Sequence, residues 1–150
     1  MNETHIEAMD MAEALLDEGD ELAEEGKDEE ALARFNAAWN ALPEPREACE
    51  LAVAVLGAIA DSHFHLGRWN ECREAAQNAF RAGAELDNPF LRLRLGQSYF
   101  ELGDLAEAKN WLAPAYLQNG PPLFEDEDPK YLASFRGELE PPPDGWPEGW

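Results

Sequence analysis

Apolar residues recur every three or four positions along most of the chain, which is the spacing of amphipathic α-helices. The pattern runs from Thr4 to about Gly120, and β-branched residues are scarce within it. It predicts about six helices of roughly 12 to 20 residues each, joined by short turns. Five glycines fall at the ends of the helical runs, namely Gly26, Gly67, Gly83, Gly103 and Gly120.

Residues that favour helix N-termini mark several of the expected helix starts. Thr4–Glu7 has the form of a capping box, so we expect the first helix to begin there. Pro45 and Pro89 each suit the first position of a helix. Asn88 suits the N-cap of the helix that is expected to begin at Pro89. Asp104–Glu107 offers another cap, with a glutamate three residues after the aspartate.

The composition changes after Gly120. Two prolines break the helix there, and the acidic run Glu125–Asp128 follows. Pro129 is expected to open a short helix that reaches about Leu139. Three apolar residues share one stripe of this helix: Tyr131, Leu132 and Phe135. We therefore predict that it covers the apolar flank of the preceding helices.

The last ten residues, 141–150, are rich in proline and tryptophan and have no helical pattern. Their prolines favour an extended polyproline II conformation. Two interpretations stay open for this tail: Trp146 and Trp150 dock back on the protein, or the terminus is frayed.

Three segments of the chain share an internal pattern. Each has a turn glycine, a small residue five positions later, and a second small residue seven positions after that. Small residues at this spacing let two helices cross closely, as a stacked helical hairpin requires. The three pairs of small residues are Ala31 and Ala38, Cys72 and Ala79, and Ala108 and Ala115.

With these residues the chain resembles the tetratricopeptide-repeat (TPR) family over about three quarters of its length. The third copy matches best, the first copy matches well, and the middle copy is the most degenerate, with Ala60 where the family has a glycine. The copies begin near residues 12, 53 and 89, which are 41 and 36 residues apart, whereas the family period is about 34. The third copy carries Leu95, Gly96, Tyr99, Gly103, Asp104, Ala108, Leu112 and Ala115; the first carries Gly19, Leu22, Gly26, Ala31, Phe35, Ala38 and Pro43.

The resemblance implies an all-α fold, a right-handed superhelical stack of three TPR-like helix hairpins with a C-terminal capping helix. We accordingly divide the chain into a repeat region, 1–120, an acidic linker and capping helix, 121–140, and the tail, 141–150. The repeats themselves are placed at about 12–45, 53–86 and 89–120.

In this family the first helix of each repeat lines a concave groove, which implies where a partner binds. Asp61 is expected to face the acidic residues of the first repeat from the next hairpin. Acidic chaperone tails are disfavoured as partners, because Asp20 stands where such a clamp needs a polar or basic group. The partner-binding residues implied are Glu13, Asp17, Asp20, Glu24, Asp61, Phe64, His65, Phe90, Arg94, Gln97, Phe100 and Glu101.

The net charge of the chain restricts the classes of partner that it can bind. Its 150 residues include 32 Asp and Glu against 11 Lys and Arg, a net charge of −21. Residues 1–50 alone hold 16 acids and 3 bases. Nucleic acid and anionic membranes are excluded, because each phosphate contact needs a cation. With 45% hydrophobic residues the chain is nevertheless expected to fold.

No catalytic or cofactor motif is evident, so we expect no enzyme activity, cofactor or metal. His63 and His65 point about 200° apart on a helix and cannot share a metal. Cys49 and Cys72 form no CxxC pair and are interpreted as small core residues. The longest apolar stretch, 51–60, is too short for a membrane span, and the acidic start is unlike a secretory leader. A cytoplasmic location is expected.

These features favour a non-catalytic module whose groove binds a protein. The short acidic chain resembles bacterial TPR proteins that neutralise a toxin, which implies an immunity-type inhibitor of a basic partner. One alternative is a secretion-type chaperone that grips an apolar peptide with Phe64, Phe90 and Phe100. An alternative of another class is a metal-dependent hydrolase that uses His63, His65 or Cys72. The partner's identity and the oligomeric state, monomer or dimer, stay open.

Overall fold

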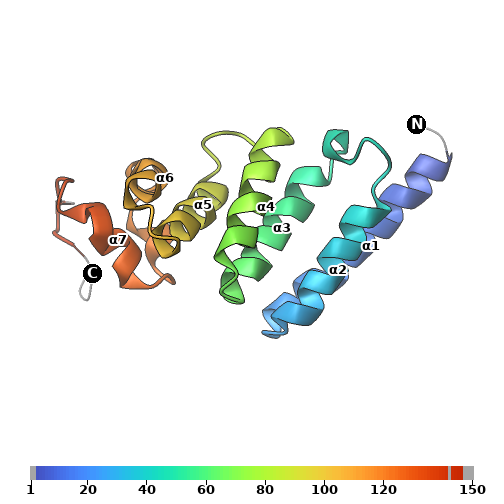
Figure 1. The fold of residues 1–150 in the computed structure, drawn as a ribbon, viewed down its shortest axis with the longest axis horizontal. Coiled ribbons are helices and arrows are strands. Elements are labelled where there is room, and N and C mark those ends of the chain that lie inside the picture. The colour runs from blue at the N-terminus through green and yellow to red at the C-terminus, as the bar shows by residue number, and fades with distance from the viewer. Residues whose placement is uncertain (1–2, 142, 147–150) are drawn as a thin grey trace. The chain divides into compact units, whose positions relative to one another are not determined.

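A computed structural model describes residues 3–141 and 143–146 of the chain (Figure 1). Within these ranges it contains α-helices and short 3-10 turns and no strand. The 3-10 turns are η1 (Arg46–Ala48) and η2 (Pro121–Phe124). The α-helices are α1 (Glu3–Glu24), α2 (Asp28–Ala41), α3 (Ala52–His65), α4 (Trp69–Arg81), α5 (Pro89–Glu101), α6 (Leu105–Asn119) and α7 (Pro129–Arg136).

The chain divides into two compact units. The first, residues 1–85, holds the hairpins α1–α2 and α3–α4, and α2 also packs on α3. The second, residues 86–150, holds the hairpin α5–α6 followed by η2 and α7, both of which pack on α6. The first six helices are thus three hairpins, as the repeat pattern predicts.

The turns of the three hairpins share one hydrogen-bonded geometry. In each, a glycine adopts a positive φ: 78° at Gly26, 72° at Gly67 and 89° at Gly103. The N–H of the next residue then donates to the carbonyl five positions earlier, over 2.9, 2.8 and 2.9 Å respectively. This is the Schellman ending of a helix, which an L side chain at the glycine position would strain. The glycine spacing that defines the repeats therefore has a backbone cause.

Close approach within each hairpin depends on small residues. A Cβ at Gly19 of α1 would lie 2.4 Å from Cε1 of Phe35 on α2. A Cβ at Gly96 of α5 would lie 2.6 Å from Cγ of Leu112 on α6. Both glycines are buried, and so is Cys72. These contacts are the cores of the hairpins.

The capping helix is confirmed. Tyr131, Leu132 and Phe135 of α7 are all buried. Ring centroids of Phe124 and Phe135 lie 6.0 Å apart, and each ring also approaches Tyr116 of α6. The aromatic cluster therefore closes the apolar flank of the third hairpin. α7 ends at Arg136, three residues before the predicted end.

Two of the expected helix caps are confirmed. The side chain of Asn88 accepts a hydrogen bond from the N–H of Leu91 at 3.1 Å, with Pro89 at the first helical position. The side chain of Asp104 accepts from the N–H of Glu107 at 3.2 Å. Each cap satisfies a backbone donor that the helix itself leaves unpaired.

Three local expectations are wrong. Thr4 does not cap the first helix, because α1 already includes Glu3. Pro45 precedes only the short turn η1, and α3 begins at Ala52. Cys49 is half-buried in the segment between η1 and α3 and is not a core residue.

The tail has one described contact with the second unit. The ring centroid of Trp146 lies 5.6 Å from that of Tyr116, so this tryptophan docks on α6. Trp150, the other tryptophan of the predicted tail contact, lies outside the described residues.

Candidate functional site

Four carboxylates form one stripe along α1. Glu13, Asp17, Asp20 and Glu24 are spaced by four, three and four residues, so they share one face of the helix. All four side chains are exposed. Within the described part of the chain none of them forms an ion pair with a basic residue. We call this stripe the α1 acidic face.

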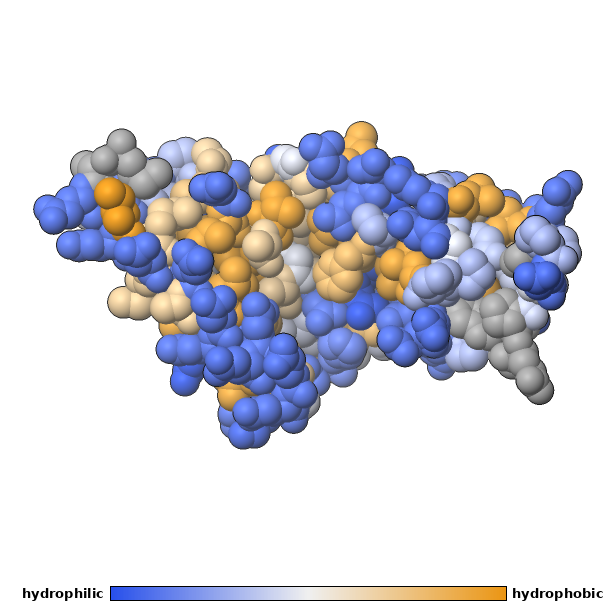
Figure 2. Space-filling model, turned by 180° about the vertical axis from the view of Figure 1, so that it is seen from behind, coloured by the Kyte–Doolittle hydropathy of each residue, from blue (hydrophilic) through white to orange (hydrophobic). Residues whose placement is uncertain are grey.

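The cations nearest in sequence are engaged elsewhere on the same hairpin. Lys27 Nζ lies 3.0 Å from a carboxylate oxygen of Glu25, and Arg34 Nε lies 3.2 Å from one of Glu18. Figure 2 shows a largely hydrophilic surface at the turn end of this hairpin, which is the lobe at the bottom of that view. The α1 acidic face therefore keeps its negative charge uncompensated.

The carboxylates of the α1 acidic face repel one another. Partial burial raises the pKa of Asp20 above its usual value, and the charges of Asp17 and Glu24 raise it further. A carboxylate whose pKa is raised by like charges is stabilised by any cation that approaches it. The face is therefore suited to bind a basic group.

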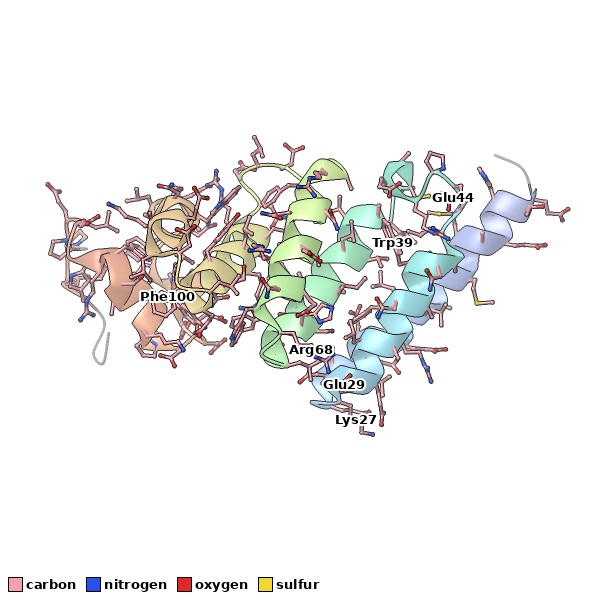
Figure 3. All side chains as sticks on the ribbon, viewed as in Figure 1. Lys27, Glu29, Trp39, Glu44, Arg68 and Phe100 are labelled. Carbon is pink, nitrogen blue, oxygen red and sulfur yellow. The ribbon has the colours of Figure 1, made fainter. Side chains whose placement is uncertain are left out.

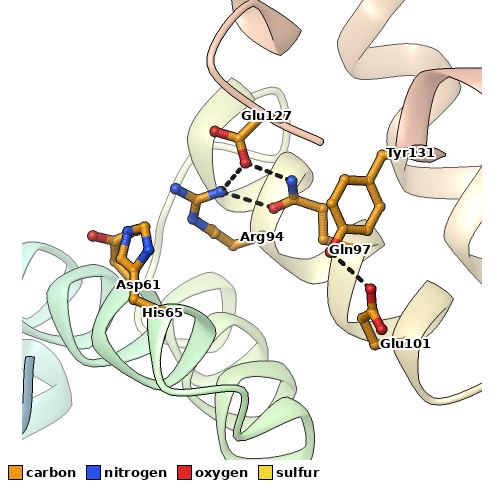
Figure 4. A network of polar contacts seen from close by, with 7 residues as sticks. All are labelled: Asp61, His65, Arg94, Gln97, Glu101, Glu127 and Tyr131. Atoms are coloured by element: carbon orange, nitrogen blue, oxygen red, sulfur yellow. Dashed lines mark hydrogen bonds and ion pairs between the residues drawn. The ribbon is translucent and has the colours of Figure 1, made fainter. Parts of the chain in front are cut away.

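The second hairpin places three predicted residues at the end of α3. Nε2 of His65 lies 3.3 Å from Oδ1 of Asp61, one turn earlier on the same helix (Figure 4). The ring of Phe64 lies edge-on to Trp69, with centroids 5.6 Å apart. The prediction that Asp61 faces the α1 acidic face stays a prediction, since its described partner is on its own helix.

In the third hairpin, Arg94 and Gln97 bind a carboxylate of their own chain. Arg94 Nη1 donates to Glu127 Oε1 at 2.6 Å and to Gln97 Oε1 at 2.8 Å (Figure 4). Gln97 Nε2 donates to the same oxygen of Glu127 at 2.6 Å. The side chains of Arg94 and Glu127 are only 7% and 13% exposed. The linker thus supplies an internal anion to two residues predicted to bind a partner.

The remaining predicted residues of α5 also have neighbours within the second unit. Glu101 accepts from the Tyr131 hydroxyl at 2.9 Å, and Lys130 lies 2.6 Å from the same carboxylate. Burial raises the pKa of Tyr131, and its hydrogen bond to Glu101 adds to the rise. Phe100 lies edge-on to Tyr131 at 5.2 Å.

Phe90 is the most exposed of the predicted α5 residues. It is 38% exposed, and the Arg94 guanidinium lies 5.3 Å from the centre of its ring. Of the three phenylalanines that would grip an apolar peptide, Phe64 and Phe100 already pack against rings of their own unit. Of these three phenylalanines, only Phe90 is exposed.

The twelve predicted residues therefore divide between the two units, with seven on α1 and α3 and five on α5. Sequence reasoning missed the role of Glu127, Lys130 and Tyr131 as partners of α5. The acidic segment Glu125–Asp128 has the composition of a solvent-exposed segment, and no local pattern distinguishes Glu127 from its neighbours. A partial signal existed in Arg92 and Arg94, each of which stands between two leucines, because a cation that is buried needs a counter-charge.

The described residues contain no group of three or more His, Cys, Asp or Glu side chains that could hold a metal ion. None of the helices in ranges 3–141 and 143–146 combines the length and the apolar character needed to cross a bilayer.

No known family model matches the chain, and no curated protein matches it. Solved structures of other proteins share its fold. The C-terminal TPR-containing domain of a putative FK506-binding protein of Plasmodium falciparum superposes with a TM-score of 0.72 at 17% identity, covering 88% of each chain.

Two further TPR domains are similar. The first TPR of Spaghetti (RPAP3), bound to the HSP90 peptide SRMEEVD, has a TM-score of 0.66 at 18% identity and covers 84% of this chain and 94% of its own. The N-terminal domain of stress-induced protein-1 from C. elegans has a TM-score of 0.62 at 18% identity, with 89% and 98% covered. These likenesses and the helix order confirm the predicted all-α TPR fold.

Proposed function

We propose that this chain is a non-catalytic protein-binding module of the immunity type, which binds and neutralises a basic protein. The α1 acidic face is the observation that supports the proposal. Its four exposed carboxylates lie in a row, and none of them forms an ion pair with a basic residue in the described part of the chain. Lysine or arginine side chains of a partner would supply the missing counter-charges. The non-catalytic role rests on analogy with the fold.

An acidic ligand fits this chain less well than a basic one. The structure of Spaghetti (RPAP3) holds an HSP90 peptide that ends in two glutamates, a valine and an aspartate. Here Arg94, the buried cation of α5, already pairs with Glu127. An acidic peptide would have to displace that carboxylate, and the net charge of −21 would repel it.

Charge also favours fast capture of a basic partner. A net charge of −21 on 150 residues produces a long-range attraction for cations, which raises association rates at low ionic strength. An inhibitor benefits from this, because it must reach its target before the target acts. Occlusion by the bound module then accounts for neutralisation.

The experiment is a growth-rescue assay paired with calorimetry, using the product of the coding sequence next to that of this chain. Wild type should bind that product 1:1 and restore growth to cells that express it. The variant Asp17→Lys/Asp20→Lys/Glu24→Lys, which we call the α1 lysine variant, should fail to restore growth. The α1 lysine variant should melt at or slightly above the temperature of the wild type, so that a failure to restore growth does not come from unfolding.

A matched control makes the same change in net charge at three other positions. Glu30, Glu74 and Glu85 are exposed residues of the first unit, outside the α1 acidic face. Their triple change to lysine, the control lysine variant, should restore growth as the wild type does. The proposal is wrong if the wild type does not bind, or if both lysine variants behave alike.

A further inference from the structure

A cavity of about 310 Å³ opens at the N-terminal end of α1, within the first unit. It exists because α1 has 22 residues and its partner α2 only 14, so the first turns of α1 extend past the end of α2. His5 and Met9 form one wall, and the segment 43–50 between α2 and α3 forms the other. Figure 3 shows Glu44 in this segment, beside α1.

The cavity is lined mainly by apolar groups. Met9 faces Pro43, Pro45 and Ala48 across it. The thiol of Cys49, which also lines the cavity, donates a hydrogen bond to the carbonyl of Pro43 at 3.1 Å. The thiol hydrogen is therefore already donated within the segment and is not offered to a ligand. The cavity lining contacts a ligand mostly through dispersion. A volume at the low end of ligand pockets suits one large side chain.

Two carboxylates, those of Glu44 and Glu50, are among the groups that line this cavity. Residues 3–10 and 43–50 together carry six carboxylates and one guanidinium. The guanidinium is that of Arg46, and it lies 2.8 Å from a carboxylate oxygen of Glu44. Glu50, which lines the cavity, has no partner within the described ranges. Burial raises the pKa of the Cys49 thiol, and the charges of Glu44 and Glu47 raise it further. The cavity entrance is therefore negative.

The cavity also continues the α1 acidic face. Met9 precedes Glu13 by four residues and Asp20 by eleven, which places all three on one stripe of the helix. Met9 and Asp17 are about 12 Å apart along the helix axis, at 1.5 Å per residue. A single partner surface that lies along α1 can thus reach the acidic stripe and the cavity together.

We propose that this cavity binds one large apolar side chain, such as phenylalanine, carried on a basic segment of the protein partner. The proposal rests on the proposed function for the charge of that partner. A second copy of this chain is disfavoured, because it would bring more carboxylates to a negative entrance. An anionic membrane is disfavoured for the same reason.

The probe is the capped tripeptide Lys-Phe-Lys, titrated into the full chain with 13C-labelled methionine methyl groups. The chain has three methionines, of which Met9 lines the cavity and the exposed Met11 does not. The Met9 signal should shift saturably, and the Met11 signal much less. Lys-Ala-Lys and Glu-Phe-Glu should bind about tenfold or more weakly, since each lacks one of the two required features.

Filling the cavity provides the matched variants. Ala48→Leu adds an apolar side chain inside it, whereas Ala33→Leu adds the same group at an exposed position of α2. Ala48→Leu should weaken Lys-Phe-Lys binding about tenfold or more, and Ala33→Leu should leave it unchanged. Glu50→Gln, which leaves the apolar lining intact, should weaken binding with no loss of thermal stability. This keeps the test valid if Ala48→Leu alters the local fold.

Two results would overturn the proposal: no saturable shift of Met9 with Lys-Phe-Lys, or binding that Ala48→Leu and Glu50→Gln leave unchanged. The proposed function fails separately, if the α1 lysine variant still neutralises the partner. In that case a Met9 shift that meets the criteria above still supports the cavity as a binding site. The tripeptide and the growth assay thus report on the two proposals independently.

Discussion

At the residue scale, Glu127 holds a buried cation in place. It accepts hydrogen bonds from Arg94 and Gln97, whose side chains are both buried. Removing one member of a buried ion pair is costly, because the remaining charge is neither solvated nor paired. Glu127 therefore contributes to stability although it belongs to an acidic run.

We expect Glu127→Gln to lower the free energy of unfolding by about 3 kcal/mol, because it leaves the Arg94 guanidinium buried beside a neutral amide. Urea unfolding at neutral pH measures this. Glu125→Gln is the control, since Glu125 is exposed, and its effect should stay within about 0.5 kcal/mol. Equal effects of the two substitutions would show that the network does not form.

A second residue-scale feature is His63, whose Nδ1 is buried and has no hydrogen-bond partner in the described structure. Burial lowers the pKa of His63 below its usual value, and Arg68 also lowers it, against the opposing charges of Glu71 and Glu29. The folded chain thus keeps His63 neutral at a pH where the unfolded chain protonates it. Stability must therefore fall as the pH drops through the unfolded pKa of about 6.5.

His63→Gln should consequently reduce the loss of unfolding free energy between about pH 7.5 and about pH 5.5. Urea unfolding of the wild type and the variant at both pH values checks this. If His63→Gln shows the same pH dependence as the wild type, His63 does not titrate as its burial implies.

At the scale of elements, α7 completes the third hairpin. Its three buried side chains, Tyr131, Leu132 and Phe135, would each contribute on the order of 1.5 to 3 kcal/mol by leaving water. A helix of eight residues is too short to be stable alone, so its stability comes from this packing. In the described part of the tail, Trp146 packs on Tyr116.

Deleting residues 121–150 should therefore lower the melting temperature far more than deleting 141–150. Circular dichroism melts of the two truncations and the full chain give the comparison. Among the described residues, the shorter deletion removes the contact of Trp146 with Tyr116. Melting of both truncations at the temperature of the full chain would contradict the capping role of α7.

Much at this scale could be predicted from the sequence, because local chemistry decides it. The turn glycines impose the Schellman geometry, and Asn88 and Asp104 cap the helices they precede. The same reasoning failed at Thr4 and Pro45, since a suitable cap does not oblige a helix to begin beside it. Several residues together determine where a helix begins or ends, so a single motif predicts the position poorly.

The candidate site could be predicted only in part, for a physical reason. The α1 acidic face lies on one helix, so its spacing alone places its members together. The network around Arg94 joins residues 33 positions apart, and its formation depends on how the linker returns to α5. No periodicity in the sequence encodes that return.

At the scale of the whole molecule, charge is the property that relates the fold to the proposed function. The 21 excess negative charges disfavour folding through self-repulsion, and a basic partner would relieve them. The α1 acidic face concentrates this effect: partial burial raises the pKa of Asp20, and the charges of Asp17 and Glu24 raise it further. Reversing these charges should leave the fold intact or slightly more stable, because the mutual repulsion disappears.

The most direct measurement is surface-plasmon association kinetics with the protein encoded beside this chain. At low salt the α1 lysine variant should associate about tenfold or more slowly than the wild type, while the control lysine variant should be much less affected. Near 1 M salt, where the screening length is about 3 Å, the difference should largely vanish. Association of the α1 lysine variant at the wild-type rate in low salt would contradict the account.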